Sequence, residues 1–154
     1  MKNLIREDLA RTGASLGCWL NLASSLAAEI LAAVGFRWLC VDIEHTPIDL
    51  EKLTNLVRAI ESRGAVPLVR LADCESSSIA RALDTGVYGI IAPHIQNVEQ
   101  AQRLEDVSYY PPRGFRSSGS SRAKTISPDY ESNCNDQLLI IAQIEDRRVW
   151  KMPT

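Results

Sequence analysis

Residues 36–70 read FRWLCVDIEHTPIDLEKLTNLVRAIESRGAVPLVR, and this stretch decides the fold class. Its two ends, 36–41 and 65–69, are short runs that are mostly apolar at consecutive positions, which is typical of parallel strands buried on both faces. Between them, apolar residues recur at the spacing of one helix face: Leu50, Leu53, Val57 and Ile60. The stretch therefore predicts a strand, a helix and a second strand, the repeating unit of a parallel sheet covered by helices.

The predicted helix carries its own start and stop signals. Thr46 is expected to cap the start, with Pro47 in the first turn and Asp49 three residues after the cap. Gly64 is expected to follow the end, because glycine readily adopts the left-handed conformation that closes many helices.

The same alternation extends outward on both sides of this stretch. Further apolar runs predict three more strands, at 15–20, 87–92 and 138–143. Gly35 and Gly86 stand where a helix should give way to a strand, and Asn97 with Gln100 forms a second capping pattern. The fold class predicted from the residues is therefore α/β.

Two architectures fit this alternation, an open doubly wound sheet and a closed (β/α)8 barrel. Five strands would complete an open sheet, whereas a barrel takes about 250 residues, so length alone favours the open sheet. No G-x-G-x-x-G or G-x-x-x-x-G-K-[ST] motif follows a predicted strand, however, so the phosphate-binding loops common in open sheets are missing. Residues 109–127, rich in Pro, Gly, Ser and Arg, predict a long irregular connection of a kind that is commonly functional.

The charge balance narrows the range of partners. Of 154 residues, 17 are Lys or Arg and 19 are Asp or Glu, which gives a formal net charge of −2 and no positive field for a nucleic acid or an anionic membrane. The apolar runs are far shorter than the roughly 20 residues of a membrane helix, and the first residues lack a signal peptide's apolar core. We therefore expect a soluble, cytoplasmic protein with no nucleic-acid or membrane partner.

The four cysteines lie far apart, which predicts free thiols and no zinc site.

Polar side chains follow the predicted strands at their carboxyl ends, where parallel α/β folds place their sites. They lie in the segments Asp42-Ile43-Glu44-His45, Arg70, Pro93-His94 and Gln143-Ile144-Glu145-Asp146. An acid–base group, a cation and carboxylates would converge on one rim, which suits an oxyanionic substrate held by a divalent metal. A polar residue at a surface rim also needs no function, and for each residue taken alone that interpretation stays open.

These residues belong to a longer series of motifs. In chain order the motifs are Gly17-x-Trp19 with Ser24-Ser25, Asp42-x-Glu44-His45-x-Pro47, Pro67-Leu68-Val69-Arg70, Leu83-Asp84-x-Gly86, Pro93-x-x-Gln96-Asn97, Tyr110-Pro111-Pro112-x-Gly114-x-Arg116 and Gln143-Ile144-Glu145. In order and spacing the chain resembles the HpcH/HpaI aldolases, metal-dependent 2-oxo-acid aldolases of the phosphoenolpyruvate-binding TIM-barrel superfamily. The resemblance implies a partial (β/α)8 barrel of about the first five βα units. It also implies the reversible cleavage of a 4-hydroxy-2-oxo acid to pyruvate and an aldehyde.

The resemblance assigns roles to individual residues. His45 would be the base, acting through a metal-bound water, with Asp84 as the carboxylate that fixes its imidazole. Arg70 would bind the keto or enolate oxygen of pyruvate, where negative charge develops. Glu145 would be a ligand of a divalent cation, Mg²⁺ or Mn²⁺ with Co²⁺ as a third candidate, and Gln143 would lie close by as a hydrogen-bonding, substrate-binding group. The full-length family member is expected to be a homo-oligomer, a hexamer.

Other polar residues receive lesser assignments. Glu44 is expected to be a hydrogen-bond partner that shapes the site, outside the shell of metal ligands. His94 has no matched role and is expected to be a surface-loop residue. Arg70 could instead pair with Asp73, and Arg116 is expected to be a solvated arginine of the long connection.

The resemblance stops after Arg148, so the sequence divides into an N-terminal barrel part, 1–148, and a non-matching tail, 149–154. The family's second acidic metal ligand and its carboxylate-binding loop would lie beyond this point. The tail is compatible with a frameshift, biological or from sequencing, in an aldolase gene. An alternative therefore stays open, in which the chain is a catalytically inactive fragment that serves at most as a binding or assembly module.

Overall fold

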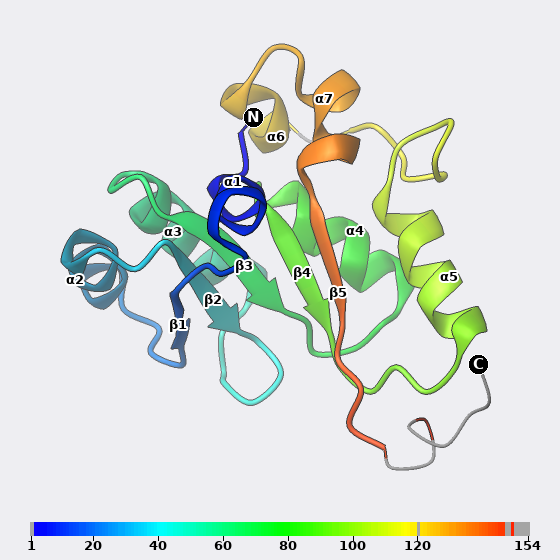
Figure 1. The fold of residues 1–154 in the computed structure, drawn as a ribbon, viewed down its shortest axis with the longest axis horizontal. Coiled ribbons are helices and arrows are strands. Elements are labelled where there is room, and N and C mark those ends of the chain that lie inside the picture. The colour runs from blue at the N-terminus through cyan, green and yellow to red at the C-terminus, as the bar shows by residue number, and fades with distance from the viewer. Residues whose placement is uncertain (1, 120, 147–148, 150–154) are drawn as a thin grey trace.

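The computed structural model describes residues 2–119, 121–146 and 149. Its centre is one sheet of five parallel strands (Figure 1), namely Gly17–Leu20 (β1), Trp38–Asp42 (β2), Val66–Arg70 (β3), Gly89–Ala92 (β4) and Leu139–Ala142 (β5). Each strand falls within one of the predicted apolar runs or extends it by one residue, so the predicted strands are confirmed.

The strands lie side by side in chain order, β1-β2-β3-β4-β5. A doubly wound sheet would double back from its first strand, so the open doubly wound sheet that length alone favoured is wrong. Sequential parallel strands joined through helices are the arrangement of a (β/α)8 barrel, and the predicted partial barrel is confirmed. Among the described residues, β1 and β5 each pair with a strand on one side only, so the sheet is not closed.

Helices cover the sheet and fill its connections. They are α1 (Leu4–Thr12), α2 (Ser25–Val34), α3 (Leu50–Glu61), α4 (Ser76–Asp84), α5 (Val98–Ser108), α6 (Ser121–Ile126) and α7 (Tyr130–Gln137). The helices α2 to α5 pack on one face of the sheet and form the main core with it. On the other face, Ile5 of α1 packs against Cys40 and Leu68. The central strands are thus buried on both faces, as their continuous apolar runs predicted.

The start of α3 differs from the prediction. Asp49, rather than Thr46, caps the helix, and its carboxylate accepts a hydrogen bond from the backbone N–H of Lys52 at 2.8 Å. Thr46 lies in the preceding loop, where its hydroxyl donates to the backbone carbonyl of Asp42. The loop between β2 and α3 is therefore longer than predicted, and it holds the residues that follow Asp42 clear of the helix.

Two other local predictions are confirmed. The side chain of Asn97 caps α5, and the amide oxygen of Gln100 accepts a hydrogen bond from the backbone N–H of Gln96. Gly35 and Gly86 have φ angles of 112° and 91°, in the left-handed region. Both glycines turn the chain from the end of a helix toward the next strand.

The connection 109–127 is more ordered than predicted. It contains α6, and Arg116 within it is 4% exposed. Its guanidinium donates to Asp84 at 2.8 Å and lies over the ring of Tyr110. The prediction that Arg116 is a solvated arginine is therefore wrong, because the residue fixes this connection to the end of α4.

In the part of the chain that the structure describes, the helices are all too short or too polar to cross a lipid bilayer. The four cysteines are free thiols. The predicted boundary at residue 148 lies outside the described residues, as does the predicted tail 149–154 apart from Val149.

Candidate active site

The carboxyl ends of β2 and β3 place a buried ion pair at the centre of the rim. Asp42 and Arg70 end these strands and stand opposite one another in the sheet register. The guanidinium donates from Nε to Oδ1 at 3.0 Å and from Nη2 to Oδ2 at 2.6 Å, so the pairing is bidentate. Asp42 is fully buried, and 12% of the Arg70 side chain is exposed. Arg70 therefore pairs with Asp42 rather than with Asp73.

This pair fixes the charge of both groups. Burial alone would raise the pKa of the Asp42 carboxyl, but Arg70 and the backbone N–H groups of His45 and Glu44 hold that pKa below its usual range. The hydrogen bond to Asp42 raises the pKa of the Arg70 guanidinium. Both groups are therefore charged at neutral pH.

Asp42 also shapes the loop that carries the next polar residues. Its Oδ1 accepts hydrogen bonds from the backbone N–H groups of Glu44 at 3.0 Å and His45 at 3.3 Å. A carboxylate that bonds the backbone two and three residues ahead forces a tight turn. The turn brings the Glu44 side chain back toward Arg70 and leaves 68% of the His45 side chain exposed.

Glu44 links the end of β3 to the end of β4. Its side chain is 8% exposed, with Oε2 at 3.2 Å from Nε of Arg70 and Oε1 at 3.1 Å from Nε2 of His94. Nε2 of His45 lies 3.8 Å from the same Oε1. Glu44 thus faces a guanidinium and two imidazoles, which makes it more central than predicted.

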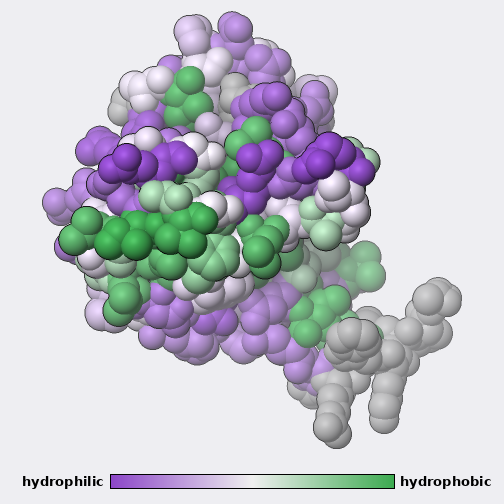
Figure 2. All heavy atoms as spheres, turned by 60° about the vertical axis from the view of Figure 1, so that its left-hand side comes forward, coloured by the Kyte–Doolittle hydropathy of each residue, from purple (hydrophilic) through white to green (hydrophobic). Residues whose placement is uncertain are grey.

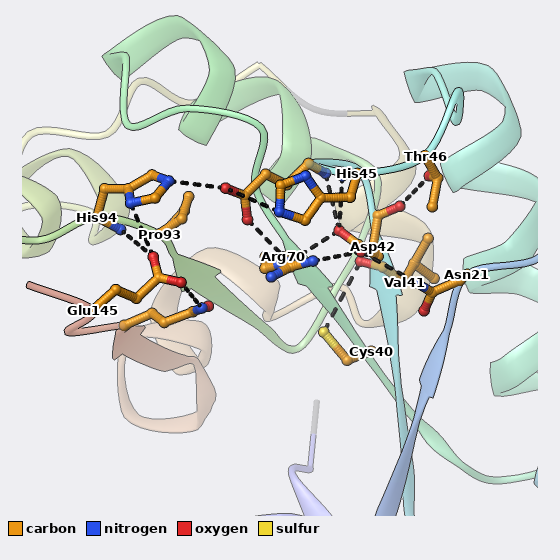
Figure 3. Close-up of polar contacts among 12 residues, drawn as sticks. Asn21, Cys40, Val41, Asp42, His45, Thr46, Arg70, Pro93, His94 and Glu145 are labelled. Carbon is orange, nitrogen blue, oxygen red and sulfur yellow. Dashed lines mark hydrogen bonds and ion pairs between the residues drawn. The ribbon is translucent and has the colours of Figure 1, made fainter.

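His94 and Glu145 continue this line to β5. Nδ1 of His94 lies 3.0 Å from Oε2 of Glu145, and the backbone N–H of His94 donates to the same oxygen at 3.2 Å. Nε2 of Gln143 donates to Oε1 of Glu145 at 2.8 Å. The connected side chains are drawn in Figure 3 and are called here the rim network: Asp42, Glu44, Arg70, His94 and Glu145.

The structure separates one predicted site residue from the others. Asp84 ends α4, and a helix of this fold runs back against the strands, so Asp84 lies near the start of β4. There it pairs with Arg116. His45 lies at the opposite end of the sheet, so within this chain Asp84 does not lie beside its imidazole. Glu44 is the carboxylate beside His45 instead.

The sequence analysis assigned Asp42, Glu44 and His94 lesser roles than their contacts in the structure indicate. Asp42 and Arg70 end neighbouring strands, and a carboxylate at Asp42 favours a tight turn in the residues that follow it. That signal could have linked Asp42 and Glu44 to Arg70. For His94 the decisive feature is a backbone φ of 56°, which no residue pattern in the sequence indicates.

The donor atoms around Glu145 fit a hard divalent cation. Glu145 offers a carboxylate that is 37% exposed, and the amide oxygen of Gln143 is buried without a hydrogen-bond partner among the described residues. Mg²⁺ and Mn²⁺ prefer such oxygen ligands and commonly fill their remaining positions with water or substrate. Within the described residues, no group of three or more His, Cys, Asp or Glu side chains is arranged to hold a metal ion. The chain itself would therefore supply few of the ligands.

A cavity of about 480 Å³ opens at the Glu145 end of the rim network. It is lined by His94, Gln96, Glu145 and Asp146. Neither His45 nor Arg70 lines this cavity. These two residues and Glu145 are connected instead through the contacts of Glu44 and His94.

Comparison with known proteins gives consistent matches over most of the chain. Residues 15–152 match the family model described as HpcH/HpaI aldolase/citrate lyase. The 4-hydroxy-2-oxo-heptane-1,7-dioate aldolase of Shigella sonnei is 35% identical over 155 residues, which cover 98% of this chain and 59% of that protein. The hydroxypyruvate/pyruvate aldolase of Roseovarius nubinhibens is 34% identical over 149 residues, covering 94% and 58% of the two chains.

A solved structure shares the same arrangement. The HpcH/HpaI aldolase/citrate lyase family protein of Burkholderia cenocepacia superposes with a TM-score of 0.86 and 31% sequence identity. The superposition covers 96% of this chain and 62% of that one. The chain therefore spans less than two thirds of the length of the relatives it matches.

Proposed function

The chain belongs to the HpcH/HpaI aldolase/citrate lyase family, and from this premise we propose that it acts as a metal-dependent aldolase. The reaction is the reversible cleavage of a 4-hydroxy-2-oxo acid to pyruvate and an aldehyde, which makes the protein a carbon–carbon lyase. Two relatives named as aldolases support the reaction class. The observation that carries the proposal is the rim network, which brings Arg70 and Glu145 to one edge of the sheet beside His45.

Arg70 is the proposed binding group for the 2-oxo oxygen. Cleavage of the C3–C4 bond leaves its electron pair on pyruvate, so negative charge develops on that oxygen. Asp42 holds the guanidinium in one orientation through Nε and Nη2, and the ring of Trp19 lies under it with 5.1 Å between Cζ and the ring centroid. Nη1 takes no part in these contacts and is the donor assigned to substrate. A guanidinium oriented before the reaction stabilises the developing charge without reorganising.

His45 is the proposed base. In the direction of cleavage it takes the proton of the C4 hydroxyl as the C3–C4 bond breaks, and in the direction of condensation it returns that proton. Its exposed ring lies beside Glu44, which stabilises an imidazolium once the proton has arrived. Glu44 is therefore proposed for the supporting role that the resemblance assigned to Asp84.

Glu145 is the residue that would hold the divalent cation, Mg²⁺ or Mn²⁺, with Co²⁺ also compatible with its carboxylate. Gln143, which donates a hydrogen bond to that carboxylate, is the proposed substrate-binding group beside it. When bound, the cation supplies a Lewis acid that polarises the carbonyl group of the 2-oxo acid. The proposed partners are the small 2-oxo acid, pyruvate and the aldehyde. A cytoplasmic homo-oligomer, a hexamer, is proposed on the family resemblance.

The test is release of pyruvate from 4-hydroxy-2-oxoheptane-1,7-dioate by the purified chain with Mg²⁺, Mn²⁺ or Co²⁺. We expect His45→Ala and Arg70→Ala each to lower kcat/KM by at least about 100-fold, as is typical when a group that stabilises developing charge is lost. Arg63→Ala is the matched control, because Arg63 pairs with Glu29 on the exposed helical face away from the rim.

The same assay decides the alternative that the chain is a catalytically inactive binding or assembly module. A folded chain that releases no pyruvate with any of the three cations would favour the inactive module and contradict the proposed activity. Turnover that survives both rim substitutions would contradict the assigned residues while leaving the reaction class in place.

A further inference from the structure

His94 is held in an unusual conformation within the rim network, between Glu44 and Glu145. Its φ of 56° lies in the left-handed region, which non-glycine residues adopt uncommonly although His, Asn and Asp do so more often than others. Such a backbone persists when its surroundings hold it. Here both ring nitrogens and the backbone N–H contact carboxylates: Nε2 contacts Glu44, and Nδ1 and the N–H contact Glu145.

The carboxylates of Glu44 and Glu145 contact different nitrogens of the His94 ring. Glu44 is nearly buried and pairs with Arg70, so it is a charged, fixed acceptor for a proton on Nε2 of His94. In the neutral tautomer that donates this hydrogen bond from Nε2, Nδ1 carries the lone pair. Histidines that bind metals characteristically donate their other ring N–H to a carboxylate in this way.

The lone pair of Nδ1 then faces Oε2 of Glu145 at 3.0 Å. Two electron-rich atoms at that distance repel unless a proton or a metal cation lies between them, and 3.0 Å accommodates either. Ligand atoms about 2.1 Å from one ion and at right angles to each other are about 3 Å apart. The separation of Nδ1 and Oε2 therefore matches two neighbouring ligand positions of one cation.

We propose that Nδ1 of His94 is a second protein ligand, beside Glu145, of the divalent cation that the proposed function requires. The inference rests on that function and adds a ligand that the family resemblance did not assign. Imidazole nitrogen binds Co²⁺ better than it binds Mg²⁺, which prefers oxygen ligands, so His94 biases the site toward Co²⁺ over Mg²⁺. With two side-chain ligands, the cation takes its other ligands from the 2-oxo acid and water.

The chain suits a direct test because it contains only two histidines, His45 and His94. Cobalt is titrated into the chain in the presence of pyruvate, and proton spectra are recorded in H₂O and D₂O. A histidine that binds Co²⁺ through Nδ1 gives a hyperfine-shifted ring N–H signal that disappears in D₂O. We expect one such signal, present in His45→Asn and absent from His94→Asn.

Calorimetric titration of the same variants measures the affinities. We expect His94→Asn to weaken Co²⁺ binding by about tenfold or more, and Mg²⁺ binding by about twofold at most. Asparagine tolerates the positive φ of this position, and His94→Gly, which is free of backbone strain, serves as a second variant. Gln96→Ala is the matched control, because Gln96 lines the same cavity as His94 and Glu145.

The outcomes separate this inference from the proposed function. If Glu145→Gln loses both cations while His94→Asn binds them like the unaltered chain, His94 is only a hydrogen-bond partner, and the inference fails while the metal site stands. If the unaltered chain with pyruvate binds neither cation, the proposed metal site and the ligand role of His94 fail together.

Discussion

Asp42 is the residue on which the geometry of the rim depends. It is fully buried, receives two hydrogen bonds from Arg70 and turns the following loop through two backbone N–H groups. A buried carboxylate of this kind is stable only while its partners are in place. Removing its charge should therefore affect both the stability of the fold and the orientation of Arg70.

Asp42→Asn is expected to lower the free energy of unfolding by about 3 kcal/mol at pH 7, because it removes the bidentate counter-charge of the buried Arg70 guanidinium and leaves only the contact with Glu44. Urea denaturation measures the change. Glu29→Gln is the matched control: it removes the partner of Arg63 in an exposed pair, which should cost at most about 1 kcal/mol. Equal effects of the two substitutions would contradict the central role of Asp42.

The same carboxylate predicts a pH dependence. The pKa of Asp42 is lower in the folded chain than its ordinary value of 3.8, so the unfolded chain binds this proton more readily. The stabilisation is fully present above that ordinary value and is lost as the pH falls through the lower folded pKa. The difference in stability between the unaltered chain and Asp42→Asn should therefore shrink in urea denaturation series carried below pH 4. A difference that stays constant in that range would contradict the assignment.

Sequence reasoning reached part of the candidate site because the carboxyl ends of parallel strands meet at one edge. That rule is enough to bring Arg70 and Glu145 together. It says nothing of the contacts made by loop residues, which depend on backbone angles such as that of His94. A motif match also gives a role but no distance, and within this chain α4 places Asp84 near the start of β4, away from His45.

At the scale of the elements, the strands were predictable and one helix start was not. Continuous apolar runs identify strands that are covered on both faces, and β1 to β5 follow those runs. Thr46 and Asp49 are both good capping residues, and both precede the apolar face of α3. Their spacing alone does not distinguish them. Tertiary contacts distinguish the two residues, because the hydroxyl of Thr46 donates a hydrogen bond to the backbone carbonyl of Asp42.

Asp49→Ala tests this correction. Loss of the carboxylate that caps α3 is expected to lower the free energy of unfolding by about 1 kcal/mol, measured by urea denaturation. Asp129→Ala is the matched control, because Asp129 precedes α7 without a side-chain capping hydrogen bond and should change stability by less than about 0.5 kcal/mol. A larger effect at Asp129 than at Asp49 would contradict the assigned cap.

At the scale of the whole molecule, local patterns do not determine the order of strands. The same alternation of strand and helix serves an open doubly wound sheet and a barrel, and the chain length pointed to the first. The motif series pointed to the second, and the order β1-β2-β3-β4-β5 confirms it. The open edges follow from that order, with Trp19 of β1 39% exposed and Ile141 of β5 38% exposed.

Beside the β1 edge, α2 presents apolar side chains to solvent. Leu26, Ile30 and Val34 are 68%, 54% and 73% exposed, and their spacing of four residues puts them on one helix face. Figure 2 shows a hydrophobic band on this side of the molecule. Exposed apolar surface next to an unpaired strand edge favours association between chains.

We therefore expect the chain to self-associate at micromolar concentration, as measured by sedimentation velocity. The double variant Leu26→Lys/Ile30→Lys should raise the concentration needed for association by at least about tenfold, since burying each of these side chains is worth about 1.5–3 kcal/mol. Val98→Lys is the control, because Val98 is equally exposed but lies at the start of α5.

If the unaltered chain stays monomeric and melts in a sharp, reversible two-state transition, neither the α2 face nor the strand edges drive association. If only the double variant dissociates, the helix face is the dominant surface; if it associates unchanged, the edges of β1 and β5 remain as the cause.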